Sequence, residues 1–112
     1  QASGSKVGVM MFNGTNWVNV GSAGGVSAGI TSYASLAIAF DGTPYLAYQD
    51  AANGFKATLI MFDGTNWVDV GNAGFSAGRA DYTSLAINSS GTPYVAYVDA
   101  ANADKATVMS YQ

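Results

Sequence analysis

The chain of 112 residues contains no cysteine, no histidine and no glutamate. Disulfides and thiolate chemistry are therefore excluded, and the usual pairing of a nucleophile with a general base has no residues to form it. We expect neither an enzymatic activity nor a cofactor. Three lysines and one arginine face seven aspartates, for a net charge of -3. Because no basic cluster is present to neutralise phosphates, nucleic acid is not an expected partner.

Long apolar runs are also missing from the sequence. None approaches the length that spans a bilayer, so membrane insertion is not expected. The chain does not begin with a basic segment followed by an apolar one. Its low charge and its start, Gln-Ala-Ser-Gly, favour a mature secreted product and an extracellular location. Abundant glycine together with β-branched and aromatic residues predicts an all-β fold.

An internal repeat dominates the sequence. Residues 56–71 read KATLIMFDGTNWVDVG, residues 6–21 read KVGVMMFNGTNWVNVG, and residues 105–112 read KATVMSYQ. The two copies are related by an offset of fifty residues before a glycine-rich loop at 24–27 and of forty-nine after it. A period of this length indicates an array of stacked units, a solenoid or a propeller.

Each repeat is expected to form four strands, because runs rich in Val, Ile, Tyr, Phe, Trp and Thr alternate with turn residues. The predicted strands are 35–40, 44–50, 56–62 and 67–70, with counterparts at 84–88, 93–99, 6–12, 105–111 and 17–20. Tight turns such as Asp41-Gly42 and Asp63-Gly64 favour hairpins between consecutive strands. The longer loops at 21–32 and 71–81 are expected to cross between sheets. No helix is predicted.

The predicted strands are apolar on both faces. In the strand at 35–40, Leu36, Ile38 and Phe40 lie on one face, and small residues lie on the other. Sheets with two apolar faces are expected to be covered on both sides, with large residues of one sheet meeting small residues of the next.

The order of motifs resembles a known kind of repeat. SLAI, GTPYVAY, DAAN, KATVM and GTNWVxVG follow one another as in the blades of about fifty residues found in bacterial secreted β-propellers and in designer propellers derived from them. The resemblance implies antiparallel four-stranded blades, with the SLAI strand lining a central channel and the Trp-containing strand outermost. Residues 1–112 then form a single all-β module with two repeats. It comprises a complete blade at 33–71, a three-stranded blade at 82–112 that lacks its outer strand, and the third and fourth strands of a further blade at 6–21.

This strand count predicts self-assembly. Nine strands are expected where two blades need eight, so one edge strand is surplus, and propellers carry at least four blades. Open strand edges and uncovered apolar faces are normally protected in proteins. We therefore expect copies of the chain to assemble, with 6–21 donated to a neighbour. A closed ring of four chains and an open filament both remain possible. The residues expected at the interface are Lys6, Val9, Met11, Trp17, Val108 and Met109.

A ligand-binding function is the alternative. Trp17 and Trp67 are candidates for sugar-stacking platforms in a lectin-like propeller that binds glycans, or else they close the gap between blades. Tyr33 and Tyr82 precede the inner strands, and they would line a ligand site at the mouth of a channel together with the nearby Arg79 and Asp81.

The remaining polar motifs have simpler interpretations. Asp50 and Asp99 are expected to cap turns. Three oxygen donors occur at Asp99, Asn102 and Asp104, but the first repeat does not reproduce the set and no glutamate is available, so no metal site is predicted. Two sequons, which begin at Asn13 and Asn88, mark possible glycosylation sites.

Overall fold

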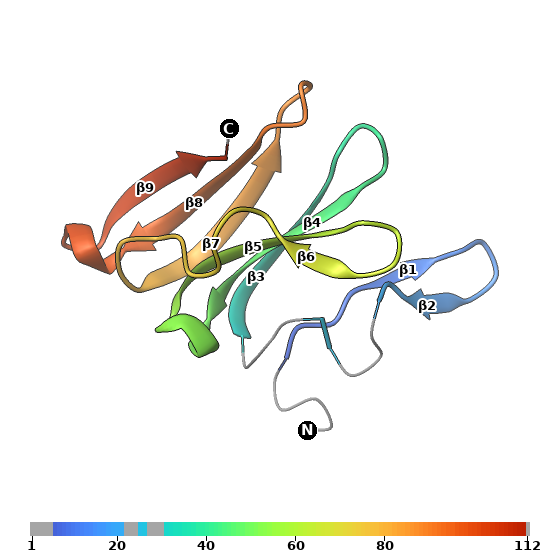
Figure 1. Cartoon of the computed structure of the whole chain (residues 1–112), viewed down its shortest axis with the longest axis horizontal. Coiled ribbons are helices and arrows are strands. Elements are labelled where there is room, and N and C mark those ends of the chain that lie inside the picture. Colours follow the sequence, from blue (N-terminus) through green and yellow to red (C-terminus); the bar gives the residue numbers. More distant parts are fainter. Residues whose placement is uncertain (1–5, 22–24, 27–30, 112) are drawn as a thin grey trace.

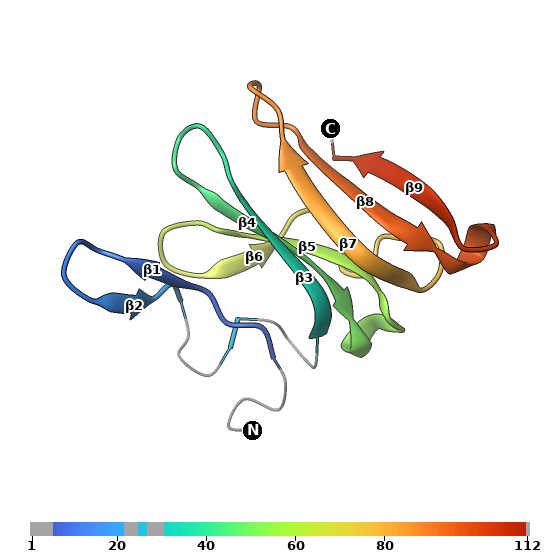
Figure 2. The same ribbon diagram turned by 180° about the vertical axis from the view of Figure 1, so that it is seen from behind.

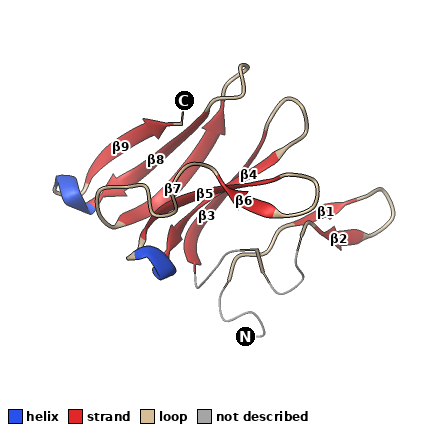
Figure 3. Ribbon diagram, viewed as in Figure 1, coloured by secondary structure: helices blue, strands red, loops and turns tan. Residues whose placement is uncertain are grey.

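The structure, a computed structural model, describes residues 6–21, 25–26 and 31–111, and it is all-β as predicted (Figures 1 and 3). It contains three antiparallel sheets with the strand orders β1-β2, β3-β4-β5-β6 and β7-β8-β9. We call them the N-terminal hairpin, the middle sheet and the C-terminal sheet. Their strands are β1 (Met10–Phe12), β2 (Trp17–Asn19), β3 (Thr31–Ile38), β4 (Pro44–Asp50), β5 (Lys56–Phe62), β6 (Trp67–Asp69), β7 (Ala80–Ile87), β8 (Pro93–Asp99) and β9 (Lys105–Ser110).

The strand bounds agree with the sequence pattern apart from two differences. β1 covers only Met10–Phe12 of the predicted strand 6–12, because it pairs with β2 over only three residues. β3 and β7 begin at Thr31 and Ala80, before the predicted starts, because each continues through a bulge and pairs again with the end of the following strand. As predicted, no α-helix occurs among the described residues, and the turns after β4 and β8 each contain a single 3-10 turn, at Ala51–Asn53 (η1) and Ala100–Asn102 (η2). In both, an aspartate at the end of the preceding strand caps the turn.

The three sheets lie side by side, with the middle sheet between the N-terminal hairpin and the C-terminal sheet (Figures 1 and 2). The first strands of the two larger sheets, β3 and β7, are in contact with each other. β6 lies at the opposite edge of the middle sheet from β3. None of the sheets closes on itself within the described residues, and the molecule measures 46 × 37 × 19 Å.

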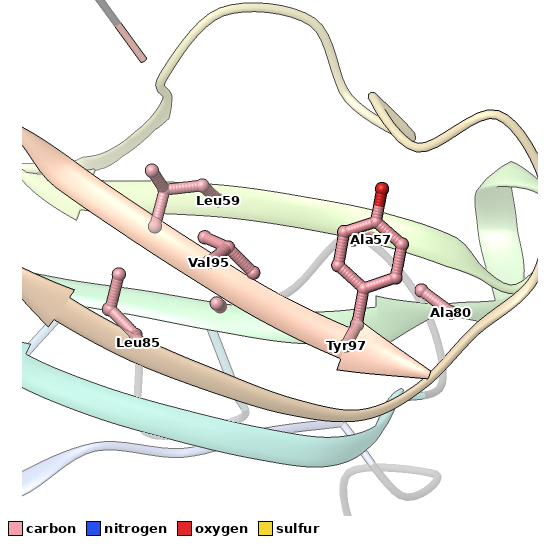
Figure 4. Close-up of a cluster of buried hydrophobic side chains, with 7 residues drawn as sticks. Ala57, Leu59, Ala80, Leu85, Val95 and Tyr97 are labelled. Carbon is pink, nitrogen blue, oxygen red and sulfur yellow. The ribbon is translucent and has the colours of Figure 1, made fainter. Parts of the chain in front are cut away.

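The middle sheet is buried on both sides over β4 and β5. Against the C-terminal sheet it forms a core in which Leu59 meets Leu85, Val95 and Tyr97, with small residues between them (Figure 4). Against the N-terminal hairpin, Val9 packs in a second cluster of buried side chains that also contains Leu46, Tyr48 and Ile60. Small residues take part in the core with the C-terminal sheet, whereas the buried residues of the cluster against the hairpin are all large, so the expected meeting of large and small residues is found in only one of the two.

Coverage of the middle sheet is incomplete at β3. Leu36 and Ile38 point to a face that was expected to be sandwiched, but both side chains are exposed. Phe40, at the end of the same predicted strand, is also exposed. The residues of the N-terminal hairpin that pack on this side contact β4, β5 and β6, and the cluster they form includes no residue of β3. An apolar stripe on β3 therefore remains uncovered by the described residues.

Candidate assembly interface

Trp67 closes the first junction, which we define as the contact between the N-terminal hairpin and the middle sheet. Its indole Nε1 donates a hydrogen bond of 2.8 Å to the Val20 carbonyl at the end of the hairpin. The ring lies so close to Gly21 that a Cβ there would be 2.6 Å from Trp67 Cδ1. A glycine is required at this position because the indole of the next repeat occupies the space.

The second junction, between the middle and C-terminal sheets, contains a cavity at the corresponding position. The cavity has a volume of about 180 Å³. Its lining includes Leu59, Val70, Gly71, Phe75 and Val95. These residues are the repeat counterparts of Val9, Val20, Gly21, Val26 and Leu46, which form the first junction or pack in its core cluster. The same apolar site is therefore built twice. Trp67 fills the first, and the ring of Tyr111 lies against Gly71 in the second and leaves the cavity beside it.

The two outward faces of the molecule carry counterparts of buried core residues. Leu59 is 3% exposed in the core, whereas its counterpart Val108 on β9 is 63% exposed. Leu85 is 8% exposed, whereas its counterpart Leu36 on β3 is 48% exposed. One uncovered face thus belongs to the C-terminal sheet and the other to the middle sheet, on opposite sides of the core that the two sheets share.

β9 also presents an uncovered edge. In the middle sheet β5 lies between β4 and β6, whereas β9 is paired only with β8 among the described residues. The pairing of β9 with β8 repeats that of β5 with β4, rung for rung from Asp99↔Lys105 to Tyr94↔Ser110. β9 is therefore positioned to accept an outer strand as β5 does.

The residues predicted for assembly lie in different environments. Trp17 is 65% exposed on β2, where its ring lies 5.7 Å from that of Phe12, and Met11 is exposed on β1. Lys6 is exposed at the start of the described chain. Val9, by contrast, is buried within its own chain. Of the two predicted β9 residues, Val108 is on the outward face and Met109 lines the cavity.

The predicted ligand site is brought together at the beginning of β3 and β7. The rings of Tyr33 and Tyr82 lie 4.5 Å apart, and Arg79 Nε forms an ion pair of 3.0 Å with Asp81. A side-chain hydrogen bond with Tyr82 raises the pKa of Tyr33, and the neighbouring carboxylate of Asp81 raises the pKa of Arg79. Both tyrosines have positive φ, 54° and 52°, which is uncommon for aromatic residues. The tryptophans are not part of this site, because they lie on β2 and β6.

Sequence reasoning missed Gln49 at this site. Its amide Nε2 donates hydrogen bonds to Asp81 Oδ1 at 2.6 Å and to the Ala80 carbonyl at 3.0 Å. Gln49 is buried in β4 and its counterpart in the repeat is Val98, so no repeated polar pattern identified it. The bond ties the middle sheet to the start of β7.

Asp50 and Asp99 are held as structural groups. Asp50 accepts hydrogen bonds from the Ala52 amide, the Asn53 side chain and the Thr58 hydroxyl, at 2.7 to 3.1 Å. Asp99 has the equivalent three partners, of which the Asn102 side chain and the Thr107 hydroxyl lower its pKa most. Both carboxylates are buried and satisfied, and this agrees with a role in capping turns.

Possible metal ligands, membrane-spanning helices and the two sequons are the remaining features that could carry a function. Among the described residues, no group of three or more possible metal ligands was found. No helix in that part of the chain is long and apolar enough to cross a membrane. The sequon residues Asn13 and Asn88 lie in exposed turns, where their side-chain oxygens accept backbone amide hydrogen bonds at 2.9 Å. Comparison with models of protein families, with curated proteins and with solved structures found no match.

Proposed function

We propose that the protein is a non-enzymatic structural module that assembles with copies of itself into a multi-chain, extracellular β-propeller, in which the middle sheet and the C-terminal sheet are blades. The observation that carries this proposal is the matched exposure of repeat counterparts. Leu59 and Leu85 meet inside the chain, and their counterparts Val108 and Leu36 lie on the two uncovered faces. Each uncovered face therefore carries half of a contact that the molecule already makes once.

The proposed contact is head to tail. The outward face of the C-terminal sheet of one copy stacks on the β3 side of the middle sheet of the next copy, so that Val108 approaches Leu36. Such a heterologous contact uses two different surfaces on each copy, and it propagates until it closes into a ring or continues as a filament. The residues at 6–21 of the next copy then lie beside β9 and supply the outer strand of that blade.

Face stacking contributes more free energy to this assembly than edge pairing. The pairing between β5 and β6 covers three residue pairs, and about three hydrogen bonds at roughly 1 kcal/mol each fall short of an association cost of 4 kcal/mol or more. Burial of about 600 Å² of apolar area would contribute around 15 kcal/mol as an upper estimate. We therefore assign the driving force to the faces and the register to the edge.

The ring is favoured over the filament by the arrangement of the two larger sheets. Their first strands, β3 and β7, are in contact, while the outer strand β6 lies at the far edge of the middle sheet. If each further sheet is placed on its neighbour as the C-terminal sheet is placed on the middle sheet, successive sheets turn about an axis next to their first strands (Figures 1 and 2). The filament is the outcome if the rotation between copies does not close.

Solution mass separates these outcomes. Multi-angle light scattering over a range of protein concentrations should give one discrete oligomer for a ring and an unbounded distribution for a filament. Val108→Asp places a charge on the stacking face and should shift the protein to monomer. Ser89→Asp places the same charge at an exposed residue of the β7–β8 turn, is the matched control and should leave the mass unchanged. A monomer at every concentration of the unaltered chain would refute the proposal.

Glycan binding is the second candidate, and the Tyr33–Tyr82 pair favours it. Two exposed aromatic rings in tilted contact beside an ion pair resemble the mixture of apolar and polar contacts that small-molecule sites present. Screening on a glycan array tests this function. Binding that Tyr82→Ala abolishes while the circular dichroism spectrum is retained would support it, and an array without binding would refute it.

A further inference from the structure

The two junctions differ in the aromatic side chain that lies against their glycine. At the first junction the indole of Trp67 lies against Val20 and Gly21. At the second, the ring of Tyr111 lies against Gly71, where a Cβ would be 2.9 Å from Tyr111 Cε1, and a cavity of about 180 Å³ remains beside Val70. An apolar cavity of about 150 Å³ is large enough to bind benzene. The site is thus large enough for an aromatic ring, and it has the lining of an indole site.

Trp17 is a matching occupant that the chain itself carries. It follows the same Gly-Thr-Asn turn as Trp67 and lies on β2, the counterpart of β6. Its side chain is 65% exposed, whereas Trp67 is half-buried. In each repeat the indole is expected to contact the preceding repeat, and among the described residues Trp17 has no such neighbour.

We propose that Trp17 of a second copy enters the cavity at the second junction and displaces the ring of Tyr111 from Gly71, with its Nε1 donating to the Val70 carbonyl as Trp67 donates to Val20. This inference rests on the proposed self-assembly and specifies its contact. In this contact β2 of the second copy lies beside β9 in the register that β6 adopts beside β5. The pair Ile60↔Asp69 then corresponds to Met109 of one copy and Asn19 of the other.

β9, and not β1 of the incoming copy, is retained as the third strand of the completed sheet. Thr107 on β9 donates a hydrogen bond of 2.8 Å to Asp99. The counterpart of Thr107 on the N-terminal segment is Gly8, which has no hydroxyl group. β1 pairs with β2 over only three residue pairs, whereas β9 pairs with β8 over six. β1 is therefore the strand that leaves β2, and it is the surplus strand of the nine.

Mutation of Trp17 tests whether this side chain fills the cavity at the second junction of another copy. Truncation of a buried aromatic anchor at an interface is expected to raise the concentration for half-assembly by at least about tenfold, so Trp17→Ala should do so by light scattering. Ser89→Asp, in the exposed β7–β8 turn, should match the unaltered chain. Because Trp17 is exposed in the single chain, the circular dichroism spectrum of Trp17→Ala should be unchanged. In the unaltered chain, tryptophan fluorescence should shift to shorter wavelength on assembly, and Trp17→Phe should remove most of that shift.

A mixed disulfide tests the register. One preparation carries Asn19→Cys and the other Met109→Cys, in a chain that has no native cysteine. Directly opposed residues on antiparallel strands have Cβ atoms about 4.5–5.5 Å apart, close enough for a disulfide to form with small adjustment. Oxidation of the mixture should give a linked dimer, and oxidation of either preparation alone should give much less.

The outcomes separate this inference from the proposed function. If the unaltered chain assembles and Trp17→Ala assembles equally well, or if the mixed disulfide does not form, the inference is overturned and self-assembly stands. If the unaltered chain remains monomeric at every concentration, self-assembly fails and the inference fails with it. Loss of assembly in Trp17→Ala together with the mixed disulfide supports both.

Discussion

β5 and β9 begin with the same three residues, Lys-Ala-Thr, and each pairs in the same register with the strand before it. β5 is nonetheless almost entirely buried, whereas β9 is mostly exposed. The difference lies in what surrounds them, because β5 has an outer strand and a sheet on either side. Burial in this molecule is therefore a property of the neighbours that a repeat has, and not of the repeat itself.

The largest expected effect is the loss of stability when the buried Leu59 of β5 is changed, compared with its exposed counterpart on β9. Leu59→Ala removes a side chain from the core and should lower the free energy of unfolding by about 3 kcal/mol. Val108→Ala changes the counterpart on β9 and should cost less than about 0.5 kcal/mol in the single chain. Urea denaturation at concentrations below assembly measures both. Equal losses for the two variants would contradict the described burial of these residues.

The next effect concerns the carboxylate that links β4 to β5. Asp50→Ala removes the acceptor of three hydrogen bonds and should lower the free energy of unfolding by roughly 2–3 kcal/mol. Asp50→Asn retains one oxygen acceptor and should cost less. Thermal unfolding followed by circular dichroism compares the two. Full stability in Asp50→Ala would show that the turn does not need its cap.

A smaller effect distinguishes the two turns that precede β5 and β9. The residue after η1 is Gly54, with φ of 71°, and the residue after η2 is Ala103, with φ of 57°. Because a left-handed conformation is strained for alanine, Ala103→Gly should stabilise the chain by about 0.5–1 kcal/mol. Gly54→Ala should destabilise it by a similar amount. Urea midpoints that move in the opposite directions would contradict this prediction.

The smallest expected effect is on acid stability. Asp99 has a pKa below the ordinary value for aspartate, which is about 3.9. Its contribution to stability is therefore complete above that value and is lost as the pH falls through the lower folded pKa. Melting temperatures between pH 7 and pH 3 should fall at the acid end, and the fall should be smaller in Asp99→Asn. An identical acid profile for this variant would exclude Asp99 as a contributor.

Local features of the fold could be predicted from the sequence because the signals for them are local. Pro44 and Asp50 mark the ends of β4, and the repeat supplies the same marks for β8. The early start of β3 was missed because a bulge at Tyr33, with positive φ, separates it from the regular part of the strand. Strand propensity does not predict a bulge with this conformation.

The candidate interface could be predicted only in part. The sequence predicts Trp17, Val108 and Val9 for it; Trp17 and Val108 are exposed in the single chain, whereas Val9 packs inside its own chain. It could not separate Trp17 from Trp67, because the two share the turn Gly-Thr-Asn and differ only in the sheet that faces them. Which copy of a repeat is exposed depends on tertiary contacts that no single repeat encodes.

The exposure of Leu36 and Val108 also affects the meaning of a melting temperature for this protein. If these faces are covered only by other copies, unfolding is coupled to dissociation, and mass action raises the apparent stability as the protein concentration rises. Dilution alone would then act as a denaturant. Stability of the chain is in that case a quantity that requires a stated concentration, in the same way as a binding constant.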